Sequence, residues 1–124
     1  METKQYKVLI VDDSKQMRDS LKEILIKIGY EVCGEAGDGV EAVAKCRSLK
    51  PDIVTLDMIL PKMDGLQALR VIKAFDPKII VVMLTARADK SSVMDCVKAG
   101  AAHYLLKPFD ESKVAEVMKK IAPL

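Results

Sequence analysis

The sequence lacks paired or clustered cysteines. Its three cysteines, Cys33, Cys46 and Cys96, are odd in number and include no Cys-x-x-Cys pair. This pattern argues against a disulfide framework and against a zinc site, because both require paired or clustered thiols. We therefore expect the cysteines to act as small apolar residues of a protein in the reducing cytoplasm.

Long apolar runs, a secretion signal and a strong charge are also missing. No stretch approaches the roughly 18 apolar residues that a membrane span needs, and the polar residues 1–7 lack the pattern of a signal peptide. The formal net charge is only +2. We therefore expect neither a membrane nor a nucleic acid as a partner.

What the chain does contain is enough apolar sequence for one core. Of its 124 residues, 50% are hydrophobic and 31% are charged, which is ordinary for a single globular domain over residues 1–124. Short apolar runs alternate five times with amphipathic stretches typical of helices. The predicted strands are residues 7–11, 31–36, 52–57, 78–84 and 102–106. This alternation predicts an α/β protein, with helices on both faces of a doubly wound parallel sheet.

Polar caps and glycines indicate where the helices begin and end. Asp38, Asp64 and Asp110 each precede an amphipathic stretch and are candidate N-caps. Gly29 and Gly100 follow two other amphipathic stretches, in the position of a left-handed cap. These signals leave only short loops between predicted strands and helices.

The apolar spacing also predicts which side of a helix faces the core. In the second helix, we expect Val40, Val43 and Ala44 to point inward. In the first helix, we expect Arg18 to lie mostly on the side away from the apolar stripe.

Acidic, hydroxyl and cationic side chains stand at the ends of the predicted strands. Asp12 and Asp13 follow the first strand, Asp57 ends the third, Thr85 follows the fourth and Lys107 follows the fifth. If these strands are neighbours, all five groups face one shallow site at the carboxyl edge of the sheet. Three close carboxylates cannot all stay ionised cheaply, and a divalent cation resolves this. Ligands that are all oxygen favour a hard ion such as Mg²⁺.

The remaining two groups suit a phosphoryl group. Thr85 offers a hydroxyl donor and Lys107 a flexible cation, and both can contact phosphoryl oxygens. Asp57 is then a plausible nucleophile that forms an acyl phosphate. Each residue alone is a weak signal, whereas all of them together, each at a strand end, form a strong one.

Four stretches of the chain together resemble the response-regulator receiver domains of two-component signalling, of the stand-alone chemotaxis (CheY-like) type. The matching stretches are residues 8–14, 57–65, 84–86 and 100–109. The resemblance covers essentially the whole chain. It implies a flavodoxin-like fold of five strand–helix units, with a parallel sheet in the order 2-1-3-4-5.

The same resemblance implies a role for each residue of the site. Asp57 would accept a phosphoryl group from a histidine kinase. Asp13 and Asp57 would ligate Mg²⁺ together with the backbone carbonyl of Ile59, while Asp12 would act largely through water. Lys107 would contact the phosphoryl oxygens.

A conformational switch is also implied by the resemblance. Thr85 would move toward the phosphoryl group, and Tyr104 would turn inward into the space that this move leaves. Considered without the family, Tyr104 is ordinary packing at the edge of the core. The face formed by the fourth helix, fifth strand and fifth helix would then bind a protein partner. The peptide bond between Lys107 and Pro108 would be cis.

Two further positions influence how long the phosphoryl group persists in this family. They are Ile59, two residues after Asp57, and Arg87, two residues after Thr85. Because the Ile59 side chain is apolar, it cannot orient an attacking water. We therefore expect slow loss of the phosphoryl group.

Other functions fit the sequence less well. A phosphatase with an aspartate nucleophile would need Asp-x-Asp-x-Thr after the first strand, where this chain has Asp12, Asp13 and Ser14. A flavin carrier on the same fold would need a phosphate loop rich in Ser, Thr and Gly there. An inert scaffold is disfavoured because every acidic and cationic position of the site is intact. We expect no enzyme activity beyond the chain's own phosphorylation and slow dephosphorylation.

The sequence leaves open what the phosphorylated protein acts on. The chain could contact a protein target such as a flagellar-motor component, pass the phosphoryl group on in a relay, or be a receiver from a longer regulator with its own output domain. We expect a monomer, and leave dimerisation on phosphorylation open.

Overall fold

Five short apolar runs form the strands of one parallel sheet. The computed structural model describes residues 5–86 and 89–124. Its strands are β1 (Lys7–Val11), β2 (Glu31–Ala36), β3 (Ile53–Asp57), β4 (Ile80–Thr85) and β5 (His103–Leu106). Their order is β2-β1-β3-β4-β5, and every neighbouring pair is parallel. The predicted fold is therefore confirmed, and strand ends differ from the prediction by two residues at most.

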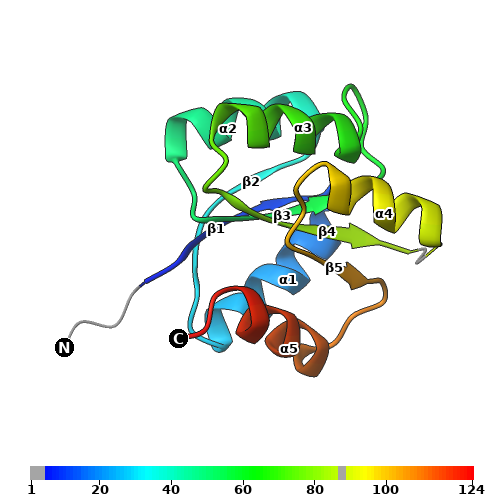
Figure 1. Cartoon of the computed structure of the whole chain (residues 1–124). Helices are drawn as coiled ribbons and strands as arrows, with labels where there is room; N and C mark the ends of the chain where they lie inside the picture. The colour runs from blue at the N-terminus through cyan, green and yellow to red at the C-terminus, as the bar shows by residue number, and fades with distance from the viewer. Residues whose placement is uncertain (1–4, 87–88) are drawn as a thin grey trace.

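Five helices cover the two faces of this sheet. They are α1 (Lys15–Lys27), α2 (Gly39–Leu49), α3 (Gly65–Phe75), α4 (Lys90–Lys98) and α5 (Glu111–Ile121). Helices α2, α3 and α4 lie on one side of the sheet, and α1 and α5 lie on the other (Figure 1). No helix in the described part of the chain is long and apolar enough to cross a membrane.

The sheet separates two apolar cores, and β3 contributes to both. Val54 and Leu56 pack in the core under α2, α3 and α4, whereas Ile53 packs in the core with α1 and α5. Because side chains alternate along a strand, Thr55 and Asp57 point to the same side as Ile53. All five residues of β3 are buried. This burial on both faces explains why the run leading to Asp57 is so uniformly apolar.

Every helix has a capped N-terminus. The side chains of Asp38, Asp64 and Asp110 accept backbone N–H bonds as the sequence predicted, and Ser14 and Asp89 do the same for α1 and α4. In the described chain the helices therefore start immediately after the loops that follow each strand. These loops form the carboxyl edge of the sheet.

The predicted inner face of α2 is wrong in part. Val40 is 51% exposed and Ala44 is also exposed, while Ala42 and Cys46 are buried against the sheet. The helix begins at Gly39, where an added Cβ would lie 2.0 Å from the backbone carbonyl oxygen of Met63. This close approach fixes the rotation of α2 so that Ala42 and Cys46 face the sheet. Apolar spacing alone therefore predicted the inward face incorrectly by part of a helical turn.

Candidate functional site

Three carboxylates meet at the carboxyl edge of the sheet. Asp12 directly follows β1, Asp13 comes next, and Asp57 is the last residue of β3. One oxygen from each lies within 4.8 Å of the others. Asp12 and Asp57 are buried, with 2% and 7% of their surface exposed, whereas Asp13 is exposed. The adjacency of β1 and β3 thus brings together the acidic residues that the sequence placed on separate strands.

Lys107, which follows the edge strand β5, contacts two of these carboxylates. Its Nζ lies 2.8 Å from Oδ2 of Asp12 and 3.0 Å from Oδ2 of Asp57. Its side chain is only 19% exposed. The lysine therefore forms two charge-assisted hydrogen bonds in a partly buried setting, where such bonds are strong. It balances one of the three negative charges.

Burial and the lysine act on the Asp57 carboxyl in opposite directions. Burial raises the pKa of Asp57, and the hydrogen bond and charge of Lys107 lower it; the net direction is upward. Burial lowers the pKa of Lys107, but its hydrogen bonds to Asp12 and Asp57 more than offset this, and its pKa is raised. Lys107 is therefore a permanent cation at neutral pH, and Asp57 is poorly compensated as an anion.

Backbone contacts hold the loop that follows Asp57. The N–H of Met58 donates to the Leu84 carbonyl at 2.9 Å, and the N–H of Gly65 donates to the Met58 carbonyl at 3.0 Å. The N–H of Ile59 donates to Oδ1 of Asp57 at 3.3 Å. A Cβ on Gly65 would lie 2.2 Å from the Asp57 carbonyl oxygen. Glycine is therefore required where α3 starts beside the acidic residue.

Thr85 borders the same depression as the acidic residues. It is the last residue of β4, it is 9% exposed, and it lines an open hollow together with Asp13, Asp57 and Lys107. Its carbonyl accepts the Lys107 N–H at 2.8 Å, which joins the ends of β4 and β5. All five residues predicted for the site thus come together. The predicted position Arg87 lies outside the described residues.

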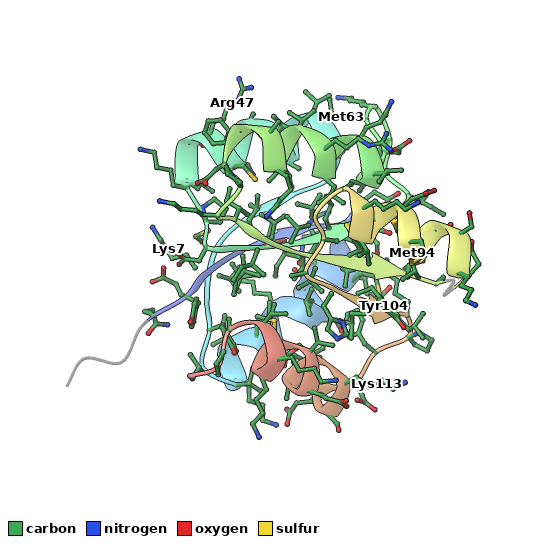
Figure 2. All side chains as sticks on the ribbon, in the orientation of Figure 1. Lys7, Arg47, Met63, Met94, Tyr104 and Lys113 are labelled. Carbon is green, nitrogen blue, oxygen red and sulfur yellow. The ribbon has the colours of Figure 1, made fainter. Side chains whose placement is uncertain are left out.

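Tyr104 lies at the surface rather than in the core. It is 37% exposed, and its ring centroid is 5.6 Å from that of His103, itself partly buried. Figure 2 shows Tyr104 between α4 and α5, on the side that also carries Met94. Next to it is a small apolar recess of about 30 Å³ that Thr85 also lines. The structure therefore shows Tyr104 in an outward position with apolar space beside it. The peptide bond between Lys107 and Pro108 is cis, as the resemblance implied.

The residues at the site fit a hard divalent cation. Asp12, Asp13 and Asp57 offer only carboxylate oxygens, and Lys107 neutralises just one of their charges. Hard ions such as Mg²⁺ prefer oxygen ligands of this kind and usually keep several waters. The exposure of Asp13 leaves one side of the cluster open to such a hydrated ion.

Sequence reasoning missed two residues that support the site. Arg18 was placed on the outer side of α1, but its side chain is only 18% exposed and its Nη1 donates to the Asp12 carbonyl at 2.7 Å. Its Nε donates to Glu35 at 3.1 Å. Side chains on a helix lean toward its N-terminus, so an arginine one turn into α1 can reach back to the strand ends. This rule could have predicted the contact of Arg18 with the strand ends from the sequence.

An acidic cluster with a bridging lysine, at the carboxyl edge of a parallel sheet, defines a phosphoacceptor module of the α/β class. Comparison with known families agrees, since residues 8–119 match the response regulator receiver domain. The chain belongs to the response regulator receiver family, and it is a phosphoacceptor response regulator of two-component signalling. Receiver domains of this type bind Mg²⁺ at the acidic pocket and act as signalling proteins rather than as enzymes.

Several relatives are similar over nearly their whole length. The chemotaxis protein CheY of Thermotoga maritima is 45% identical over 116 residues, which cover 94% of this chain and 97% of the relative. The chemotaxis protein CheY of Listeria monocytogenes is 46% identical, with 94% and 98% covered. The sporulation initiation phosphotransferase F of Bacillus subtilis is 36% identical, with 95% and 94% covered.

A solved structure shares the fold closely. The crystal structure of the CheX–CheY–BeF3–Mg²⁺ complex from Borrelia burgdorferi superposes with a TM-score of 0.91 at 38% identity. The match covers 94% of this chain and 88% of that chain. These similarities support a CheY-like receiver domain.

Proposed function

We propose that Asp57 is the residue that accepts the phosphoryl group, and that the donor is a phosphohistidine of a histidine kinase. A carboxylate oxygen of Asp57 bonds to phosphorus as the bond from phosphorus to the histidine nitrogen breaks, and the electron pair leaves with the imidazole. The position of Asp57, buried at the end of β3 and joined to Asp12 through the Lys107 ammonium, is the observation that carries this assignment.

In this proposal Mg²⁺ is held by Asp13, Asp57 and the backbone carbonyl of Ile59, with Asp12 acting largely through water. The ion supplies charge neutralisation for the phosphoryl oxygens. The contacts with the remaining phosphoryl oxygens come from side chains of the protein. Lys107 already touches the Asp57 oxygen at 3.0 Å, so a modest shift of its flexible head brings it to a phosphoryl oxygen.

The proposed switch connects the site with the surface around β5. The hydroxyl of Thr85 moves toward the phosphoryl group, and Tyr104 turns from its exposed position into the space that this move leaves, next to the small apolar recess that both residues line. A coupling free energy of roughly 1–3 kcal/mol is enough for such a two-state element. The surface that changes is formed by α4, β5 and α5. Its exposed apolar side chains on α4 and β5 are Met94, Val97, Tyr104 and Leu106.

In this proposal, a protein partner binds the surface formed by α4, β5 and α5. The partner is a downstream protein such as a flagellar-motor component or an output domain, and the similar Borrelia protein was crystallised with CheX. A phosphorelay is the second candidate, because one relative is a sporulation phosphotransferase. A receiver within a longer regulator is the third. The domain spans residues 1–124 and acts as a cytoplasmic monomer that catalyses only its own phosphorylation and dephosphorylation.

We further propose that the phosphoryl group is lost slowly. The Ile59 side chain is 80% exposed at the rim of the site and has no polar group to orient an attacking water. Arg87, the other position expected to set this rate, lies outside the described residues. A half-time of seconds for the purified phosphoprotein would contradict slow loss.

Chemical trapping tests which residue is phosphorylated. The protein is incubated with phosphoramidate, a small phosphorus–nitrogen donor, and Mg²⁺, and then treated with borohydride, which reduces an aspartyl phosphate to homoserine. Peptide mass mapping should find homoserine at position 57 alone. The Asp64→Asn variant, which changes an exposed cap in the following loop, should give the same result. Homoserine at position 12, 13 or elsewhere would contradict the assignment.

A further inference from the structure

From helix α1, Arg18 contacts both a backbone carbonyl and a carboxylate. Its Nη1 donates to the backbone carbonyl of Asp12 at 2.7 Å, and its Nε donates to the carboxylate of Glu35 at 3.1 Å. Only 18% of its side chain is exposed. A planar guanidinium can make both bonds at once, which links the ends of β1 and β2.

With this bond, the backbone N–H, the backbone carbonyl and both carboxylate oxygens of Asp12 each form a hydrogen bond. Its N–H donates to the Ala36 carbonyl at 3.0 Å. Its Oδ1 accepts from the N–H of Ser14 at 3.0 Å, and its Oδ2 accepts from Lys107 at 2.8 Å. The sheet ladder ends at Val11, so the Asp12 carbonyl depends on Arg18. Without this bond, the backbone between Asp12 and Asp13 would lose the contact that sets its orientation.

Glu35 fixes the arginine in turn. Its carboxylate is 29% exposed and also faces Lys22 at 3.7 Å. The guanidinium is therefore held by two hydrogen bonds between the ends of β1 and β2, and its side chain is mostly shielded from solvent.

We propose that Arg18 is a positioning residue for the acidic pair Asp12 and Asp13, and that it thereby sets the affinity of the site for Mg²⁺. This inference rests on the metal site of the proposed function. Groups that orient metal ligands through hydrogen bonds commonly change metal affinity by about 10–100-fold when they are removed. We therefore expect Arg18→Met to weaken Mg²⁺ binding about tenfold or more.

Two other variants separate positioning from general support of the fold. Lys22→Met removes the other cation facing Glu35 but no contact with Asp12, and its Mg²⁺ affinity should equal that of the wild type. Arg18→Lys keeps the charge, but a single ammonium lacks the fork that makes both bonds, so we expect it to bind Mg²⁺ nearly as weakly as Arg18→Met.

The experiment is a titration of the full chain with MgCl₂, followed by isothermal calorimetry and by the amide resonances of Asp13 and Asp57. Urea unfolding in EDTA shows whether each metal-free variant is folded. If Arg18→Met is unfolded, the Mg²⁺ affinity of Arg18→Lys tests the inference instead. In the metal-free arginine variants, the amide resonance of Asp13 should already be displaced. Arginine variants that bind Mg²⁺ like the wild type would overturn the inference. A wild type that does not bind Mg²⁺ would instead overturn the metal site of the proposed function.

Discussion

The ammonium of Lys107 lies 3.0 Å from a carboxylate oxygen of Asp57, although 50 residues separate the two in the chain. Only β4 separates β3, which ends at Asp57, from β5, which Lys107 follows, so the long lysine side chain can reach Asp57 across the end of β4. Lys107 also reaches Asp12 at 2.8 Å. Among the residues that the structure describes, Lys107 is therefore the cation that stabilises both buried carboxylates.

Replacing Lys107 with methionine should destabilise the metal-free protein. The change leaves Asp12 and Asp57 close together without their shared cation, and hydrogen bonds to charged groups are worth about 1.5–3 kcal/mol each. Urea unfolding in EDTA measures the loss. Lys15→Met is the matched control, because Lys15 is 78% exposed and pairs only on the surface with Asp19. If both variants lose the same stability, Lys107 does not hold the site together.

The stability of the metal-free protein should depend on pH through Asp57. Because the folded-state pKa of Asp57 is raised above its ordinary 3.8, the folded protein binds this proton more tightly than the unfolded chain does. Ionisation of Asp57 therefore costs stability above the folded-state pKa, and this cost disappears as the pH falls toward 3.8. Asp57→Asn should be more stable than the wild type at pH 7, and the difference should shrink toward pH 4. A constant difference across this range in EDTA would refute the raised pKa.

Gly39→Ala should disturb the loop that carries Ile59. Its Cβ would lie 2.0 Å from the Met63 carbonyl oxygen, so the backbone of that loop must move. Overpacking of this kind costs about 1–3 kcal/mol, more than the gain in helix propensity from alanine. Gly37→Ala is the control, since its Cβ would meet nothing closer than 3.7 Å. Equal unfolding midpoints in urea for the two variants would contradict this account.

Thr55→Val should stabilise the protein. Thr55 is 2% exposed, and its hydroxyl has no hydrogen-bond partner among residues 5–86 and 89–124. Its neighbours in the sheet, Ile10 and Val82, are both apolar. Valine has nearly the same shape and removes a polar group whose burial costs about 1–3 kcal/mol. A lower midpoint of urea unfolding for Thr55→Val would show that the hydroxyl is satisfied in solution.

Much of the fold was predictable because local signals agree with it. The apolar runs, the caps at Asp38, Asp64 and Asp110, and the glycine ends of α1 and α4 all depend on neighbours in the sequence. Gly29 and Gly100 indeed have positive φ angles of 106° and 104°. The strand order could not be read from periodicity, since it depends on contacts between distant segments. It was expected only from the resemblance to the receiver family.

The site was predictable in its members but not in its support. Strand ends predicted the grouping of Asp12, Asp57 and Lys107, because parallel strands bring their carboxyl ends to one edge. The contact between Arg18 and the Asp12 carbonyl was missed, since a stripe of apolar residues describes a helix only as inside or outside. The orientation of α2 was misjudged for a related reason, namely the close approach of Gly39 to another loop.

The most direct test of the central claim is the intact mass of the protein after incubation with acetyl phosphate. We predict that one phosphoryl group is added in the presence of Mg²⁺, that EDTA prevents the addition, and that Asp57→Asn abolishes it while Asp64→Asn does not. No addition to the wild type under any of these conditions, or addition to Asp57→Asn equal to that of the wild type, would contradict the account of Asp57 as the phosphoacceptor.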